Sequence, residues 1–356
     1  MISKDCFTSQ WIDEVSTRLE YKDKSLIEKV VRAFSLLEML VQSGCPLIFK
    51  GGTALMLILG KALHRMSIDI DIICPPGTDI ERYLGNYHEH GFIRYQLVNK
   101  ENAGRNIPVS HSKVFYKITY TDRSDLNEYI RLDVLYEDNP YSTTESIPIE
   151  SPFFKLEGKP LLVTVPTKEG ILGDKLTAFA PNTTGIPYFK GDRNCNMEII
   201  KQLYDINRLF ENVENFTETF ESFKRLSNVE LGYRGLEGLI NEYFEDVRQT
   251  ALCISTRGQA GKGDIDYFLS GIKRVKSFMY KDKYMIENAI KDASRVAYLT
   301  TCFEKGLLHI EKYSGNPEEI AFLKISDNIS SKLRKLKSIS PESYYYWAKT
   351  DELIKG

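Results

Sequence analysis

The feature of this sequence that most restricts its fold is the point at which the hydrophobic pattern changes. Strict alternation of apolar and polar residues, which is typical of β-strands, occurs only before about residue 165. Beyond about residue 213, apolar residues recur with the spacing of amphipathic helices. We therefore predict an α/β (α+β) core with a mixed sheet over residues 1–165, followed by an all-α C-terminal domain over residues 166–356.

Chain length and composition suit a protein of this kind. The 356 residues are enough for two domains, and 42% hydrophobic with 27% charged residues is an ordinary globular composition. No apolar run is long enough to cross a membrane, and the N-terminus lacks the basic and apolar segments of a signal peptide. Without an export signal or a membrane span, we expect a cytoplasmic location and no membrane contact. The six cysteines contain no C-x-x-C pair, so we expect them to be reduced thiols.

Local patterns place the individual helices and strands. Residues 8–43 are expected to be helical, with Gly44 at the position of a helix C-cap. A short strand over 46–50, a glycine turn that opens a helix over 51–60, and a strand over 67–74 come next. Further helices are predicted at 78–90, 168–180, 195–211, 214–227, 231–250, 264–281, 284–304, 316–338 and 341–354, and further strands at 92–98, 111–121, 128–137 and 160–165.

Two aspartates lie in the strand predicted over 67–74, shortly after the glycine turn. Residues two apart on a strand point to the same face, so Asp69 and Asp71 are expected to project together. Unpaired carboxylates are costly to bury, and Mg²⁺ is a natural partner because it prefers oxygen ligands and bridges triphosphate oxygens. Gly51, Gly52 and Thr53 supply the second half of the pattern, since a glycine turn at a helix start lets backbone N–H groups approach a phosphate.

Other interpretations of these residues exist. The D-x-D pair could be a solvent-exposed feature of an edge strand, an interpretation that the preceding Gly-Gly-Thr turn makes less favourable. A P-loop is excluded, because seven residues instead of four separate Gly52 from Gly60 and Ala62 stands where Ser or Thr is required.

A third carboxylate is expected if two metal ions serve the attacking and leaving oxygens. Asp133 is the candidate, because it is a single acid in the otherwise apolar and aromatic strand predicted over 128–137. Its neighbours along the strand take the opposite face, which leaves Asp133 to point into a cleft. The alternative is a structural acid paired with Arg131 or a nearby lysine.

These residues together resemble a known family. The segment FKGGTALMLILG…HRMSIDIDI is similar to the first motif of the DNA polymerase β-type nucleotidyltransferases, and it most resembles the AbiEii/AbiGii branch of abortive-infection toxins with its GGT, R-x-S and D-x-D elements. The resemblance continues through Asp133, the lysine of GDKLTAFA and the helix KQLYDINRL, so it covers about residues 45–210. It departs from the family in two places: the interval from Gly52 to Asp69 is long, and Gln202 replaces an acid.

The resemblance implies roles for further residues and partners. It implies that Lys175 and Asp205 belong to the active site, with Lys175 neutralising charge on the triphosphate or on the leaving pyrophosphate. Arg65 and Ser67 are expected to contact phosphate, and plain surface or structural positions are the alternative for all four. The implied activity is transfer of a nucleoside monophosphate from an NTP, with Mg²⁺ (Mn²⁺ being the alternative), onto RNA at the 3′ end of tRNA. A cognate antitoxin protein is the implied partner.

The C-terminal third differs in charge from the rest of the chain. From residue 251 onward there are 18 Lys and Arg against 13 Asp and Glu, although the whole chain has a net charge of −2. Basic segments at 273–283 and 331–338, and the aromatic segment 343–349, could bind an RNA backbone and stack bases, or the aromatic residues could be core. Two rival functions are nucleotidyl transfer to a small molecule, as in antibiotic-modifying enzymes, and a non-catalytic nucleotide-binding interaction module.

Overall fold

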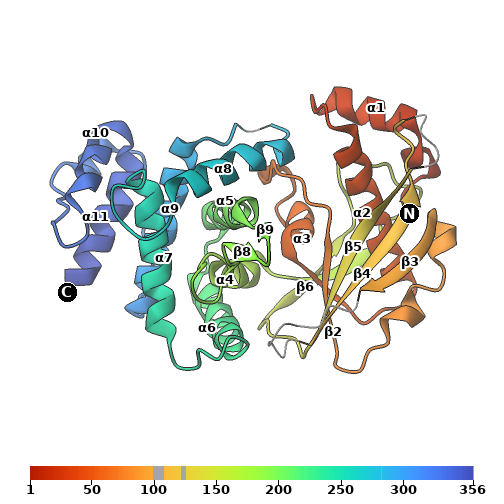
Figure 1. Ribbon diagram of the computed structural model, residues 1–356, viewed down its shortest axis with the longest axis horizontal. Helices are drawn as coiled ribbons and strands as arrows, with labels where there is room; N and C mark the ends of the chain where they lie inside the picture. The colour runs from red at the N-terminus through yellow and green to blue at the C-terminus, as the bar shows by residue number, and fades with distance from the viewer. Residues whose placement is uncertain (99–107, 122–125, 282, 356) are drawn as a thin grey trace. The chain divides into compact units, whose positions relative to one another are not determined.

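The computed structural model describes residues 1–98, 108–121, 126–281 and 283–355 (Figure 1). The chain divides into two compact units. Unit 1 comprises Met1–Thr167 with the segment Ser277–Asp282, and unit 2 comprises Lys168–Lys276 with Lys283–Gly356. The predicted boundary after residue 165 lies two residues from the observed division, but segment 277–282 belongs to unit 1 and not to the helical part of the chain.

A five-stranded sheet forms the centre of unit 1, in the order β1-β2-β5-β4-β3. Its strands are β1 (Ile48–Lys50), β2 (Ile70–Cys74), β5 (Asn127–Tyr136), β4 (Val109–Lys117) and β3 (Phe92–Val98). Strands β2 and β5 are parallel and the other pairs are antiparallel, so the mixed sheet is confirmed. A separate two-stranded sheet pairs β6 (Thr144–Pro148), which the sequence analysis missed, with β7 (Leu162–Pro166).

Helices of unit 1 differ in detail from the prediction. The segment expected to be one helix over 8–43 consists of α1 (Ser9–Arg18) and α2 (Lys24–Gln42), with a turn between them in which Glu20 has a positive φ. The predicted helix over 78–90 is wrong. It is replaced by two short 3-10 turns, because Gly85 and Asn86 in its middle are poor helix formers.

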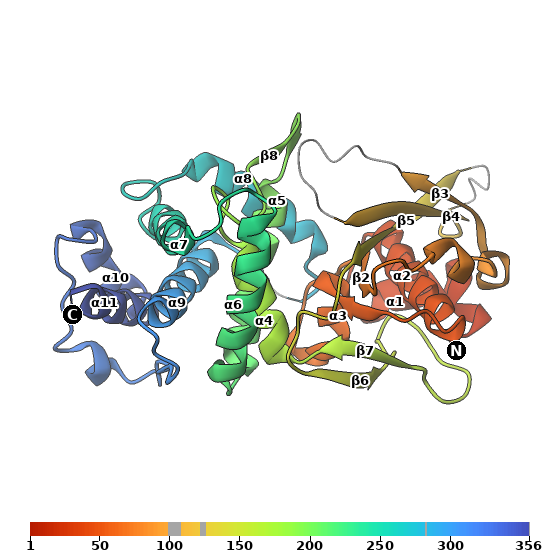
Figure 2. The ribbon, with the colours of Figure 1, turned by 90° about the horizontal axis from the view of Figure 1, so that it is seen from below.

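Unit 2 is almost entirely helical, as Figure 2 shows from a second direction. Its helices are α4 (Lys168–Ala178), α5 (Asn196–Asn212), α6 (Phe216–Gly232), α7 (Ile240–Ser255), α8 (Ile265–Val275), α9 (Ile286–Glu304), α10 (Leu336–Ile339) and α11 (Pro341–Lys355). A small hairpin, β8 (Phe189–Lys190) with β9 (Arg193–Asn194), interrupts them. The all-α prediction for the C-terminal part is confirmed apart from this hairpin.

The predicted helix over 316–338 is also wrong. The chain there forms two 3-10 turns, Pro317–Ile320 and Ser331–Lys335, and only the four-residue helix α10 follows. Ser326 explains the break, since its backbone N–H and its hydroxyl both donate to the carboxylate of Asp351 on α11. Polar residues that bond in this way compete with helix formation.

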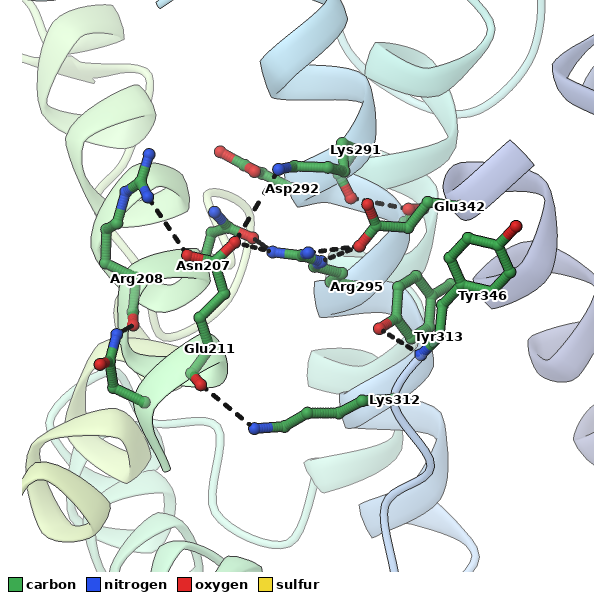
Figure 3. Close-up of polar contacts among 12 residues, drawn as sticks. Asn207, Arg208, Glu211, Lys291, Asp292, Arg295, Lys312, Tyr313, Glu342 and Tyr346 are labelled. Carbon is green, nitrogen blue, oxygen red and sulfur yellow. Dashed lines mark hydrogen bonds and ion pairs between the residues drawn. The ribbon is translucent and has the colours of Figure 1, made fainter. Parts of the chain in front are cut away.

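A polar network joins α5, α9 and α11 inside unit 2 (Figure 3). The Arg295 guanidinium on α9 donates to Asn207 and to the Glu211 carboxylate of α5, the latter at 2.7 Å, and to Glu342 of α11 through its Nε at 2.8 Å. Burial raises the pKa of Glu211, but the hydrogen bond and the charge of Arg295 outweigh it and lower that pKa. The network therefore fixes the rotation of α5 against its neighbours.

The aromatic segment near the C-terminus belongs to the core of unit 2. Tyr344, Tyr345, Tyr346 and Trp347 are all buried, so the interpretation of these four residues as a base-stacking surface is wrong. None of the helices that the structure describes is both long and apolar enough to cross a membrane.

Candidate active site

A glycine turn connects strand β1 to helix α3 (Gly51–Ile58) in unit 1. Gly51 has a φ of +80°, a conformation that residues with a side chain rarely adopt. A Cβ atom at this position would lie 2.2 Å from Oδ2 of Asp71, so the Asp71 carboxylate rests directly against the Gly51 backbone. Position 51 therefore needs glycine for its backbone conformation and for the space that Asp71 occupies.

The second glycine of the turn accommodates the two other polar residues that the sequence singled out. A Cβ atom on Gly52 would lie 2.8 Å from the Ser67 hydroxyl oxygen and 2.9 Å from Nη2 of Arg65. Arg65 is only 2% exposed, and its Nη1 donates to the Met66 carbonyl at 3.0 Å. The structure thus brings Arg65 and Ser67 to the glycine turn, with the arginine buried in the unit.

Asp71 and Asp133 are direct neighbours across two parallel strands. Asp71 of β2 is in register with Asp133 of β5. Cross-strand partners project from the same face of a sheet, and the residues on either side of each aspartate are buried on the opposite face. The alternation in the sequence correctly predicts the face of each acid, and the parallel pairing places the two acids side by side.

Asp69 precedes the strand instead of lying in it, because β2 begins at Ile70 and not at residue 67. Its carbonyl accepts a hydrogen bond of 2.6 Å from the hydroxyl of Thr53, which is fully buried. The Thr53 hydroxyl therefore donates within the protein. It joins the first turn of α3 to the segment that carries the acids.

His111 is a site residue that the sequence analysis missed. It is in register with Asp133 on β4, and its Nδ1 lies 2.7 Å from Oδ1 of Asp133, which suits an Nδ1–H donor to a carboxylate. Both side chains are about one quarter exposed, at 26% and 22%. The sequence analysis considered Arg131 or a lysine as the alternative partner of Asp133. The structure instead pairs Asp133 with a histidine on the adjacent antiparallel strand.

The donor set of unit 1 suits a divalent cation that also binds a substrate. Among the described residues, no three His, Cys, Asp or Glu side chains form a complete metal cage. Mg²⁺, however, is usually held by one or two carboxylates together with water and substrate phosphates. Two partly exposed, adjacent carboxylates beside a glycine turn fit that requirement, so the residues present are compatible with the expected ion.

The remaining predicted site residues meet each other in unit 2. The Lys175 ammonium on α4 lies 3.1 Å from Oδ2 of Asp205 on α5, and it donates to Oε1 of Gln202 at 3.0 Å. Lys175 is 7% exposed and Asp205 is fully buried, so neither is the plain surface residue of the alternative interpretation. Gln202 stands where the family usually has an acid, and its amide oxygen still accepts a hydrogen bond from Lys175.

Both groups of residues fall inside one match to a known family. The sequence model described as the nucleotidyl transferase AbiEii toxin of type IV toxin–antitoxin systems matches residues 35–262. The chain belongs to the AbiEii family of nucleotidyltransferase toxins. Membership of this family implies a nucleotide substrate and an antitoxin partner. No curated protein matches the AbiEii chain described here.

Solved structures show weaker similarity to this AbiEii protein. JHP933 from Helicobacter pylori is 17% identical with a TM-score of 0.43, and the alignment covers 79% of this chain and 94% of that one. The nucleotidyltransferase toxin MenT4 from Mycobacterium tuberculosis H37Rv is 13% identical with a TM-score of 0.43, and the alignment covers 82% and 89% of the two chains. Family membership rests on the sequence model, because both structural similarities are low.

Proposed function

We propose that this AbiEii protein is a Mg²⁺-dependent enzyme that transfers a nucleoside monophosphate from an NTP to RNA, at the 3′ end of tRNA, and that a cognate antitoxin protein restrains it. The observation that supports the chemistry is the register pairing of Asp71 with Asp133 beside Gly51. Mn²⁺ is the alternative ion. These carboxylates would hold such an ion, and the ion would supply positive charge to offset that of the triphosphate.

The protein residues have separate tasks in the proposed reaction. Backbone N–H groups of Gly51 and Gly52 at the start of α3 favour the triphosphate, since no side chain separates them from it. Asp71 and Asp133 hold the ion, with Asp69 as the third predicted ligand. His111 positions the Asp133 carboxylate through their hydrogen bond.

The bonds of the transfer are those of a nucleophilic displacement. The acceptor hydroxyl oxygen forms a bond to the α-phosphorus, the bond from that phosphorus to the bridging oxygen breaks, and pyrophosphate leaves. The hydroxyl proton passes to the carboxylate of Asp133. Lys175, held by Asp205 and Gln202, is proposed to offset negative charge that develops during the transfer.

Incubation with labelled NTPs and total tRNA tests this proposal. Asp71→Asn should reduce label transfer by about 10³-fold or more, because it removes one of the two carboxylate charges proposed to hold the Mg²⁺ ion. Asp138→Asn is a matched control, since Asp138 is an exposed acid of the same unit that lies outside the site. Chelation with EDTA should abolish transfer, and added Mg²⁺ should restore it.

The same assay can reject the proposal. Transfer by the Asp71→Asn variant at the rate of the unmodified protein would disprove the role of the acids. Label that reaches only small-molecule acceptors, and no RNA, would replace the RNA acceptor by the antibiotic-modifying alternative.

A further inference from the structure

One aromatic side chain in the basic C-terminal third has an unusual position. Phe322 is 93% exposed and is the most exposed large apolar side chain among the described residues. It follows the 3-10 turn Pro317–Ile320, and the neighbouring backbone is fixed: the Tyr344 hydroxyl donates to the Leu323 carbonyl at 2.8 Å. The fixed backbone presents this aromatic ring to solvent, in a position where a planar group can stack on it.

Two hydrogen bonds bring a lysine-rich segment to the stretch of chain that carries Phe322. The Lys337 ammonium donates to the Ala321 carbonyl at 2.9 Å, which brings α10 to the residue before Phe322. Arg334 donates to the Ile325 carbonyl at 3.1 Å and so fastens the turn before α10 to the same segment. We define the Phe322 surface by its exposed members, Phe322, Lys324, Lys332, Lys335, Lys337 and Ile339.

The charge of the Phe322 surface is strongly positive. Residues 321–339 contain five basic side chains and one acid, which gives a net charge of +4 although the whole chain is at −2. The single acid, Asp327, is paired with Arg334 at 2.9 Å. No ion pair holds any of the four lysines within the part of the chain that the structure describes. Their charge is therefore available to an anionic partner.

An exposed aromatic ring among unpaired lysines has the chemistry that binds single-stranded nucleic acid. Lysines neutralise successive phosphates, and the ring stacks on an unpaired base regardless of sequence. A membrane surface is less well matched, because only Phe322 and Ile339 are apolar members and insertion needs a broader apolar face. We propose that the Phe322 surface binds unpaired nucleotides of the acceptor RNA, with one base stacked on Phe322.

This inference rests on the proposed function for its choice of RNA, but the surface lies outside the family match. Residues 321–339 follow the matched segment 35–262, so the Phe322 surface is a feature of this chain beyond the region that defines its family. The aromatic residues that the sequence analysis considered for stacking, Tyr344–Trp347, are buried beneath this part of unit 2. Phe322 replaces them as the exposed ring.

Binding of a fluorescein-labelled single-stranded oligoribonucleotide, measured by anisotropy without NTP, tests the inference in the full chain. Phe322→Ala should weaken binding by about 5- to 100-fold, and Phe322→Tyr or Phe322→Trp should restore it, because every aromatic ring can stack. Replacing Lys324, Lys332 and Lys335 together by Gln should lower the slope of log Kd against log salt by about 2. The duplex form of the oligonucleotide should show no dependence on Phe322.

Phe189→Ala is the matched control. Phe189 is another exposed phenylalanine of unit 2, at 57%, and lies on the β8–β9 hairpin instead of the Phe322 surface, so its removal should leave binding unchanged. Equal RNA binding by Phe322→Ala and the unmodified protein would overturn the inference. So would Phe322-dependent binding to phosphatidylserine vesicles or to an acidic peptide without any binding to RNA.

Failure of the surface and failure of the enzyme can be told apart. Asp71→Asn should bind the oligonucleotide like the unmodified protein while it loses label transfer. Phe322-dependent binding without transfer to any RNA would overturn the proposed function and support the surface. Label transfer to RNA, together with RNA binding that does not depend on Phe322, would support the proposed function and overturn the inference about the Phe322 surface.

Discussion

Helix α5 holds two buried cations, and it holds them in different ways. Near its middle, Gln202 and Asp205 bind the Lys175 ammonium with one amide oxygen and one carboxylate oxygen. Nearer its end, Asn207 and Glu211 bind the Arg295 guanidinium together with Glu342 of α11 (Figure 3). The centre of the Phe210 ring lies 5.6 Å from the Arg295 guanidinium carbon. One helix therefore provides a sparse set of acceptors for a lysine and a crowded set for an arginine.

The difference suggests separate purposes for the two cations. A guanidinium is a planar fork whose donors have fixed directions, and a set of acceptors around it fixes three helices in one arrangement. An ammonium is a compact point charge with three donors, and its two acceptors here leave it able to serve a phosphate. We expect substitutions at Lys175 to affect activity and substitutions at Arg295 to affect stability.

The largest effect should come from Lys175→Gln. Label transfer per folded molecule should fall by about 10² to 10³-fold, because the positive charge proposed to offset the triphosphate is lost. Lys168→Gln, at the start of the same helix, is the control and should leave transfer unchanged. Unaltered transfer by Lys175→Gln would contradict the expectation that Lys175 takes part in the reaction.

A smaller and different effect is expected for Arg295→Met. The free energy of unfolding should fall by about 2 to 4 kcal/mol, since the carboxylates of Glu211 and Glu342 lose their cation, although both are partly exposed and so partly solvated. Urea denaturation measures this change. Transfer by the remaining folded protein should stay within about twofold of the original, since Arg295 belongs to the network and not to the reaction. A large loss of transfer at full folding would mean that the network also positions Lys175.

The last effect depends on pH and concerns Asp292, one turn before Arg295 on α9. Its Oδ2 accepts a hydrogen bond of 2.7 Å from the Tyr284 hydroxyl, and its Oδ1 is buried with no partner among the residues that the structure describes. Burial raises the pKa of Asp292 to about 7. A raised pKa in the folded state favours the protonated form, so the stability it contributes is complete below the unfolded pKa of about 4 and is lost as pH rises through about 7.

Asp292→Asn should therefore remove this pH dependence. The variant should gain stability relative to the unmodified protein as pH rises from about 4 to about 7, because the unmodified protein then has to protonate or to bury a charged carboxylate. Urea denaturation at several pH values would measure the difference. A constant difference between the two proteins across that range would contradict the assignment.

Much of the candidate site in unit 1 could be predicted from the sequence, because the patterns that specify it are local. Alternation over residues 67–74 and 128–137 sets the face of Asp71 and Asp133, and a Gly-Gly turn before a run of helix formers specifies the start of α3. Strand pairing is not local. His111 lies on an ordinary alternating strand, and only the antiparallel register of β4 with β5 brings it to Asp133.

Errors in the helical part have a related cause. Residues 316–338 have apolar residues at spacings that a helix could use, yet Ser326 is bonded to Asp351, which is 25 positions later in the sequence. No pattern within the segment can report a partner so distant. The sequence pattern also did not show which aromatic residues are buried. Four consecutive aromatic residues, Tyr344–Trp347, lie in the core, whereas Phe322 is exposed.

The contact between Gly51 and Asp71 has a practical consequence for handling a toxin. A methyl group at residue 51 would collide with the carboxylate at a position that already requires a left-handed backbone, so alanine there would displace one acid and leave the charge of the chain intact. The chain could then be produced in cells that the native protein would harm. With every surface side chain unaltered, it would show which effects on the cell require the Asp71 carboxylate in its native place.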